Sequence, residues 1–173
     1  MIEDTARVVV TGAAWMGGGV GSLEVALEEI ISSAQREILV VTYSISDGAD
    51  RLLSMIEGKL RDAVRILFVV ERLDRQHGRV PARLERMAIA YPDQFILYDF
   101  APDTLASLHA KCVVADGRTA LVGSANLSFN GLVQNYELGV VIGGDPAALL
   151  ARAVYNLCHD PGMRRILPEV TER

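Results

Sequence analysis

A histidine and a lysine stand two residues apart in one apolar stretch of the chain, His109-Ala-Lys111-Cys-Val-Val-Ala-Asp116. Side chains two residues apart on a β-strand point to the same face. We therefore expect the His109 imidazole and the Lys111 ammonium to lie side by side, with Ala110 on the opposite face. A nucleophile beside a fixed positive charge is what chemistry on a phosphate requires.

A second polar group follows in the sequence Gly123-Ser124-Ala-Asn126. Its hydroxyl and amide can hold phosphate oxygens. The chain has only two lysines, Lys59 and Lys111, against fifteen arginines. Because lysine is rarely buried without a partner, its position in an apolar strand indicates a specific role for Lys111.

Together these residues resemble the HKD motif of the phospholipase D superfamily, His-x-Lys-x4-Asp-x6-Gly-Ser-x-Asn. All six fixed positions match: His109, Lys111, Asp116, Gly123, Ser124 and Asn126. Outside the motif, the strand Val41–Ile45 and the run Asn135-Tyr-Glu137 support the resemblance. The alternative is the polar end of a strand in an ordinary α/β domain, since a motif needs its structural context.

The resemblance implies a role for each motif residue. His109 would attack phosphorus and form a covalent phosphohistidine, while Lys111 would bind a nonbridging phosphate oxygen and stabilise the transition state. Asn126 would donate to the same phosphate, and Ser124 would either do so too or cap the helical turn that follows. Asp116 lies at a β-turn, where we expect it to hold the hairpin through hydrogen bonds.

Attack requires a neutral imidazole whose other nitrogen is held by an acceptor. Glu137 stands in an N-x-E pattern of the family, and we expect it to be this acceptor; the alternative is a solvated carboxylate at a strand end. The implied mechanism needs no metal and no cofactor. His77 and His159 lack a second ligand at metal-binding spacing, and we expect both at the surface.

The motif occurs once, whereas the family's reaction uses two histidines, one as nucleophile and one as general acid. Single-motif members of the family pair two chains about a twofold axis. We therefore expect a homodimer in which His109 of each chain serves one active site, and an inactive monomer. In a longer protein, a second motif outside this sequence would take that place.

The elements that must position these residues alternate between strands and helices. Apolar runs predict strands at 7–12, 37–45, 64–70, 95–98, 108–115, 119–122 and 136–142. Helical spacing predicts helices at 23–34, 48–62, from Pro81 onward, and at 146–158. Ser22 and Asp47 are the expected caps of the first two helices.

Near-continuous apolar strands are typical of a sheet that is covered on both faces. The pattern predicts an α/β fold with a mixed, mostly parallel sheet and helices on both faces. The α/β/α sandwich implied by the resemblance agrees with this prediction. We expect a single phospholipase D-like domain over residues 1–173, with a peripheral tail at 160–173.

Composition limits the partners and the cellular location that we expect for the protein. The chain has a net charge of −5, whereas a protein that binds nucleic acid nonspecifically usually carries an excess of basic residues. A local basic cleft is still compatible with this net charge. The sequence contains no apolar run of membrane-spanning length and no basic amphipathic helix, and its start does not resemble a signal peptide. Two distant cysteines, Cys112 and Cys158, form no disulfide framework, so we expect a cytoplasmic protein without membrane insertion.

The resemblance covers phospholipases, phospholipid synthases and nucleases, and its short single-motif members are similar to bacterial endonucleases. We therefore expect a metal-independent nuclease acting on DNA or RNA. Arg72, Arg75 and Arg79 are candidate substrate-binding residues, although a solvated charged helix explains them equally well. The alternatives are a phospholipid phosphodiesterase or transphosphatidylase, and a weakly active nucleic-acid-binding subunit of a larger complex, such as a defence complex.

Overall fold

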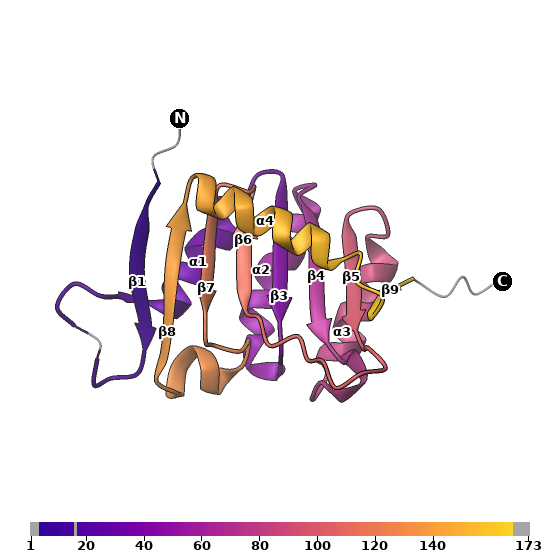
Figure 1. The fold of residues 1–173 in the computed structure, drawn as a ribbon, viewed down its shortest axis with the longest axis horizontal. Helices are drawn as coiled ribbons and strands as arrows, with labels where there is room; N and C mark the ends of the chain where they lie inside the picture. Colours follow the sequence, from indigo (N-terminus) through magenta and orange to yellow (C-terminus); the bar gives the residue numbers. More distant parts are fainter. Residues whose placement is uncertain (1–3, 16, 168–173) are drawn as a thin grey trace.

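The computed structural model describes residues 4–15 and 17–167 of the chain. Its strands are β1 (Ala6–Thr11), β2 (Gly21–Ser22), β3 (Glu37–Thr42), β4 (Arg65–Glu71), β5 (Phe95–Phe100), β6 (Cys112–Ala115), β7 (Thr119–Gly123), β8 (Glu137–Gly143) and β9 (Met163–Ile166). They form one nine-stranded sheet in the order β2-β1-β8-β7-β6-β3-β4-β5-β9 (Figure 1).

The sheet is mixed, as predicted, but the prediction that it is mostly parallel is wrong. Strands β3, β4 and β5 run parallel to one another, and β1 is parallel to β2. The other five of the eight strand pairs are antiparallel. The hairpin of β6 and β7 expected from the turn at Asp116 is confirmed. Apolar runs report burial and not direction, so they gave no sign that β8 pairs antiparallel with β7, or β6 with β3.

Helices cover both faces of the sheet, which confirms the layered α/β architecture. Helices α1 (Leu23–Ser33), α2 (Asp50–Arg61) and α3 (Val80–Ala90) lie on one face, and α4 (Asp145–Leu157) crosses the other (Figure 1). Short turns of helix occur at η1 (Asp47–Ala49), η2 (Leu73–Arg75) and η3 (Asn130–Gln134), the last with π-helical geometry. No helix in the described ranges is long and apolar enough to cross a membrane.

The central strand β3 explains why the apolar runs are continuous. Ile38 and Val40 pack into the core on the side of α1, α2 and α3. Leu39 and Val41 pack into the second core, which α4 covers. Because both faces are buried, the four positions Ile38–Val41 inside the strand are all apolar. Each such side chain contributes roughly 1.5–3 kcal/mol by leaving water.

Of the two predicted helix caps, Ser22 is confirmed and Asp47 is wrong. The Ser22 side chain accepts a hydrogen bond from Val25 N and caps α1. Asp47 does not cap α2, which begins at Asp50 after η1. The Asp47 carboxylate accepts instead from the backbone N–H of Arg79 at 2.9 Å, a contact between segments far apart in the sequence.

The expected peripheral tail is corrected for part of its length. Residues Met163–Ile166 form the edge strand β9, antiparallel to β5. Arg164 Nη2 donates to Asp99 Oδ2 at 2.7 Å and anchors this strand. A four-residue strand with two arginines carries no apolar alternation, so sequence pattern could not find it. Residues 168–173 lie outside the described part.

Candidate active site

His109, Lys111, Ser124 and Asn126 lie at one edge of the sheet, the edge where β3 ends and β6 begins, which is the lower edge in Figure 1. Strands β3, β4 and β7 end there, whereas β6 and β8 begin there, as their parallel and antiparallel pairings require. The loops that leave this edge carry Tyr43, His109, Ser124 and Asn126. Polar side chains at the ends of strands are held by a rigid sheet while remaining accessible.

His109 and Lys111 lie side by side, as expected from their spacing. Lys111 Nζ donates to the His109 carbonyl oxygen at 2.8 Å and lies 3.3 Å from His109 Nδ1. Both residues precede β6, which begins at Cys112, but the hydrogen bond from Gly123 N to Lys111 O continues the pairing with β7. His109 is exposed, whereas Lys111 is buried.

Burial changes the acid–base properties of Lys111. Loss of hydration lowers the pKa of its ammonium, and the nearby Glu137 carboxylate opposes this without cancelling it, so the pKa stays below the ordinary 10.5. A desolvated cation interacts more strongly with an anion than a hydrated one. The structure thus places a poorly hydrated positive charge beside an exposed imidazole.

Tyr43, which follows β3, packs against both His109 and Lys111. Its ring centroid lies 4.6 Å from that of His109, with the planes tilted by 56°. Lys111 Nζ lies 5.3 Å from the Tyr43 ring centroid, within the range of a cation–π contact. Sequence analysis placed Tyr43 on a strand and gave it no role, because only the fold brings it to the motif.

Ser124 and Glu137 form a second polar group. The Ser124 hydroxyl donates to Glu137 Oε2 and accepts from Leu138 N at 3.2 Å. Asn135 Nδ2 donates to Glu137 Oε1 at 3.1 Å. Both Glu137 oxygens therefore have donors other than His109 in this structure, and the role of Glu137 as the imidazole acceptor stays a prediction. Within the ranges that the structure describes, Ser124 makes no hydrogen bond to the helical turn that follows; there the Ser128 hydroxyl accepts from Gly131 N at 3.1 Å.

Asn126 is held by the segment that follows β3. Leu127 N donates to Ser44 O at 3.1 Å, and Ser46 N donates to Leu127 O at 3.0 Å. Asn126 Oδ1 is buried without a hydrogen-bond partner among the described residues. Such an atom costs about 1–3 kcal/mol and is often kept for function. Its backbone packs against Gly131, where an added Cβ would lie 2.4 Å from Asn126 O.

Asp116 lies at the far end of β6, away from His109. Its carboxylate accepts from the backbone N–H groups of Gln35, Arg36 and Glu37 at 2.8–2.9 Å. Burial by itself raises the pKa of Asp116, but these hydrogen bonds and the Arg36 charge outweigh it and hold the pKa below 3.8. Asp116 thus ties the β6–β7 hairpin to the start of β3.

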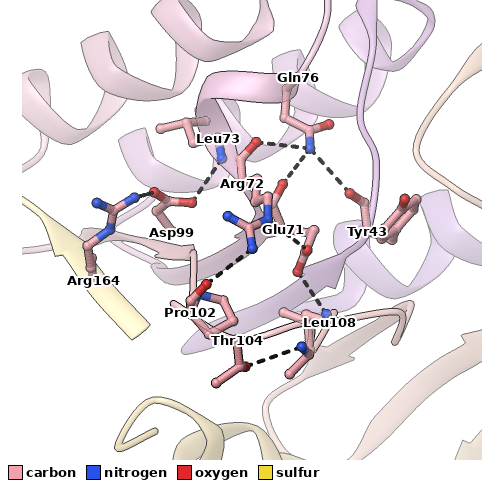
Figure 2. A network of polar contacts seen from close by, with 11 residues as sticks. Tyr43, Glu71, Arg72, Leu73, Gln76, Asp99, Pro102, Thr104, Leu108 and Arg164 are labelled. Carbon is pink, nitrogen blue, oxygen red and sulfur yellow. Dashed lines mark hydrogen bonds and ion pairs between the residues drawn. The ribbon is translucent and has the colours of Figure 1, made fainter. Parts of the chain in front are cut away.

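A buried carboxylate that sequence analysis missed supports the residue before His109. Glu71 is 6% exposed, and its Oε2 accepts from Leu108 N at 2.7 Å (Figure 2). Arg72 Nε lies 3.7 Å from Glu71 Oε1, and Arg72 Nη2 donates to Pro102 O at 3.1 Å. Glu71 and Leu108 are 37 residues apart, so spacing could not connect them.

The loop after β4 is connected to Tyr43 by one side chain. Gln76 Nε2 donates to Tyr43 O at 3.2 Å and to Glu71 O at 2.5 Å (Figure 2). Arg72 and Arg75 line a cleft of about 490 Å³ together with Tyr43. Arg79 is not among its lining residues. The structure therefore brings two of the three predicted arginines close to the motif.

Metal-ligating residues and the two cysteines were the other candidates for chemistry in this chain. In the described part of the chain, no group of three or more His, Cys, Asp or Glu residues is arranged to hold a metal ion. Both cysteines are free, and burial raises the pKa of Cys112 to about 11. Cys112 is therefore a protonated core thiol at neutral pH.

Comparison with known proteins gives three kinds of match. A model of the family described as "Cardiolipin synthase, PLD-like domain" matches residues 27–156. The DISARM protein DrmC of Bacillus paralicheniformis is 29% identical over 145 residues, which cover 82% of this chain and 58% of DrmC. The chain therefore spans little more than half the length of this relative.

Solved structures share the fold. The phospholipase D family member Nuc from Salmonella typhimurium matches with a TM-score of 0.73 at 21% identity, over 95% of this chain and 99% of Nuc. NucT from Helicobacter pylori gives 0.68 at 17%, over 90% and 95%. Phosphatidylserine synthase from Haemophilus influenzae gives 0.70 at 16%, over 94% of this chain and 40% of the synthase.

Proposed function

Because the chain belongs to the phospholipase D superfamily, whose members are phosphodiesterases, we propose that it is a nuclease that cleaves DNA or RNA through a covalent phosphohistidine at His109. The main support for this proposal is the contact of 3.3 Å between the ammonium of the buried Lys111 and the imidazole of the exposed His109. A partly desolvated cation stabilises the charge that develops on a phosphate oxygen. The proposed reaction requires no metal ion.

The reaction proceeds in two displacements. In the first, a His109 ring nitrogen forms a bond to phosphorus, the P–O bond to the leaving group breaks, and the leaving oxygen takes a proton from His109 of the partner subunit. In the second, water gives its proton back to that histidine and attacks phosphorus, and the N–P bond breaks. Lys111 and Asn126 hold the nonbridging oxygens throughout.

The substrate-free contacts suggest how the site is switched on. We infer that the Lys111 ammonium, which can only donate, holds Nδ1 of His109 as its acceptor, and in that arrangement a neutral ring carries its proton on Nε2. Nε2 then lacks the lone pair that attack requires. When a phosphate draws Lys111 away, Nδ1 is free to carry the proton and donate it to a carboxylate. Glu137, close enough to influence the Lys111 pKa, is the candidate.

A homodimer supplies the second histidine. Large apolar side chains are exposed on the strand ends and turn beside the motif: Val122, Phe129, Val133, Tyr136 and Leu138. We place the twofold interface there, because an exposed apolar patch near a site indicates a contact surface. If one site needs both copies of His109, subunit exchange of native protein with an equal amount of His109→Ala will leave a mixture whose activity per total protein is about a quarter of the native value, not half.

The substrate class rests on the cleft and on the relatives. The cleft beside Tyr43 has about as much polar as apolar lining and carries Arg72 and Arg75, which suits a polyanionic strand better than acyl chains. The DrmC relative is a DISARM protein, so we propose that this chain also works within a larger assembly, in the cytoplasm. Lipid hydrolysis or transfer is the second candidate, since the matching family is described by cardiolipin synthase.

The direct test is cleavage of single- and double-stranded DNA and of RNA by purified protein in excess EDTA. Native protein and the surface control His159→Ala are expected to cleave, and His109→Ala to be inactive. Cleavage that is lost in EDTA, or kept by His109→Ala, contradicts the proposed mechanism. Turnover of phosphatidylglycerol vesicles without any nucleic-acid cleavage favours the lipid candidate.

A further inference from the structure

The cleft beside Tyr43 shares a wall with the reaction centre. It has a volume of about 490 Å³, and its walls are formed by residues 43–44, 71–72, 75–77 and 104–107. The Tyr43 ring that packs on His109 also lines this cleft. A ligand bound at His109 can therefore continue directly into the cleft.

The free positive charge in this cleft belongs to Arg75. Arg72 is already engaged, since it pairs with Glu71 and donates to Pro102 O (Figure 2). Glu71 is in turn compensated by Arg72 and by the N–H of Leu108. The exposed Arg75 side chain has no hydrogen bond or ion pair within residues 4–15 and 17–167. The cleft thus offers one uncompensated guanidinium to an anion.

The rim of the cleft also carries apolar surface. Leu105 is fully exposed at 105%, and the Tyr43 ring is 36% exposed. A nucleotide combines an anionic phosphate with a flat face that packs on apolar or aromatic side chains. An acyl chain needs continuous apolar walls, whereas Glu71, Arg75 and Gln76 interrupt these.

We propose that this cleft is a subsite for the nucleotide next to the scissile phosphate, with Arg75 binding its phosphate and Tyr43 and Leu105 contacting its base or sugar. The assignment rests on the proposed nuclease function and narrows it. The site grips a strand beyond the bond that it cuts, and Arg79, outside the cleft, takes no part.

The test compares Arg75→Ala with Arg86→Ala, an exposed arginine of α3 outside the cleft lining. The substrates are a single-stranded oligonucleotide and bis(4-nitrophenyl) phosphate, which fills only the reaction centre. Arg75→Ala is expected to lower kcat/KM on the oligonucleotide roughly tenfold and the salt slope of binding by about one. On the small diester, Arg75→Ala should keep the native kcat/KM. Arg86→Ala should keep the native kcat/KM on both substrates. Equal losses in both variants, or on both substrates, would overturn the subsite.

A binding measurement separates the subsite from the reaction. Fluorescence anisotropy of the labelled oligonucleotide is measured on His109→Ala, with and without Arg75→Ala. Binding that depends on Arg75 supports the subsite even if native protein cleaves nothing, in which case only the proposed reaction fails. Binding that is indifferent to Arg75, or Arg75-dependent binding of phosphatidylglycerol vesicles alone, overturns it.

Discussion

Lys111 Nζ sits 3.3 Å from His109 Nδ1, and the lysine carries its charge in a buried position. Within the described ranges it has no carboxylate in ion-pair contact, because Glu137 is bound by Ser124 and Asn135. The cation beside the candidate nucleophile is therefore partly desolvated and has no ion-pair partner among the described residues. In the proposed reaction a phosphate oxygen pairs with this charge, and until it binds the fold carries the free-energy cost of a desolvated cation.

Lys111→Met should separate activity from stability. We expect kcat to fall by about 10²–10³, because the cation acts on the transition state. Stability at pH 7 should rise, because the methionine removes a desolvated charge. Folding lowers the Lys111 pKa below 10.5, so the unfolded chain binds more protons in that window and native stability increases with pH towards 10.5.

The advantage of Lys111→Met should accordingly shrink between pH 7 and pH 10.5, as followed by urea unfolding. A variant that is less stable than native protein at pH 7, or an advantage that does not change with pH, would contradict the desolvated cation.

Glu71 should act as a positioning residue for His109. Glu71→Ala removes the acceptor of Leu108 N, and a shift of the adjacent histidine is expected to lower kcat by about 10–100-fold with little change in KM. Glu71→Gln keeps a carbonyl acceptor and should retain most of the activity. If Glu71→Gln is as inactive as Glu71→Ala, the carboxylate charge and not the hydrogen bond matters.

Gly131→Ala should disturb Asn126 through the backbone. The new Cβ would lie 2.4 Å from Asn126 O and 2.9 Å from Asn126 N, so the motif loop must move and kcat should fall. The control is Gly58→Ala, where nothing lies within 4 Å and alanine should stabilise α2 by about 0.5–1 kcal/mol. Native activity in Gly131→Ala would show that the loop tolerates this shift.

Asp116→Asn should cost stability without affecting chemistry. Asn tolerates the left-handed backbone at this position (φ 56°) but cannot accept all three N–H groups, so we expect a loss of about 1–3 kcal/mol at neutral pH. Folding lowers the Asp116 pKa, so its contribution is complete above pH 3.8 and disappears as pH falls through the folded-state pKa.

Acid titrations of unfolding should therefore show the two proteins converging below pH 3.8, with kcat unchanged at neutral pH. A difference in stability that persists at low pH would assign the loss to packing instead of the carboxylate.

Sequence pattern could predict the layers because β3 and β4 are apolar on both faces, and it could predict the His109–Lys111 pair from spacing alone. Beyond the hairpin at Asp116 it could not predict strand direction, since burial of Val41 is the same beside a parallel or an antiparallel neighbour. It gave no role to Tyr43 or Glu71, whose contacts with the motif cross more than thirty residues of sequence. Such long-range polar contacts arise only when the loops of one sheet edge meet.

The stereochemical course at phosphorus tests the central proposal most directly. The substrate is an oligonucleotide with a single phosphorothioate of known configuration. Cleavage in isotopically labelled water makes the terminal phosphorothioate of the product chiral, so its configuration can be compared with that of the substrate. Two displacements through His109 invert phosphorus twice, so we predict net retention of configuration. Net inversion would mean that water attacks the substrate in a single step, and it would contradict a covalent phosphohistidine.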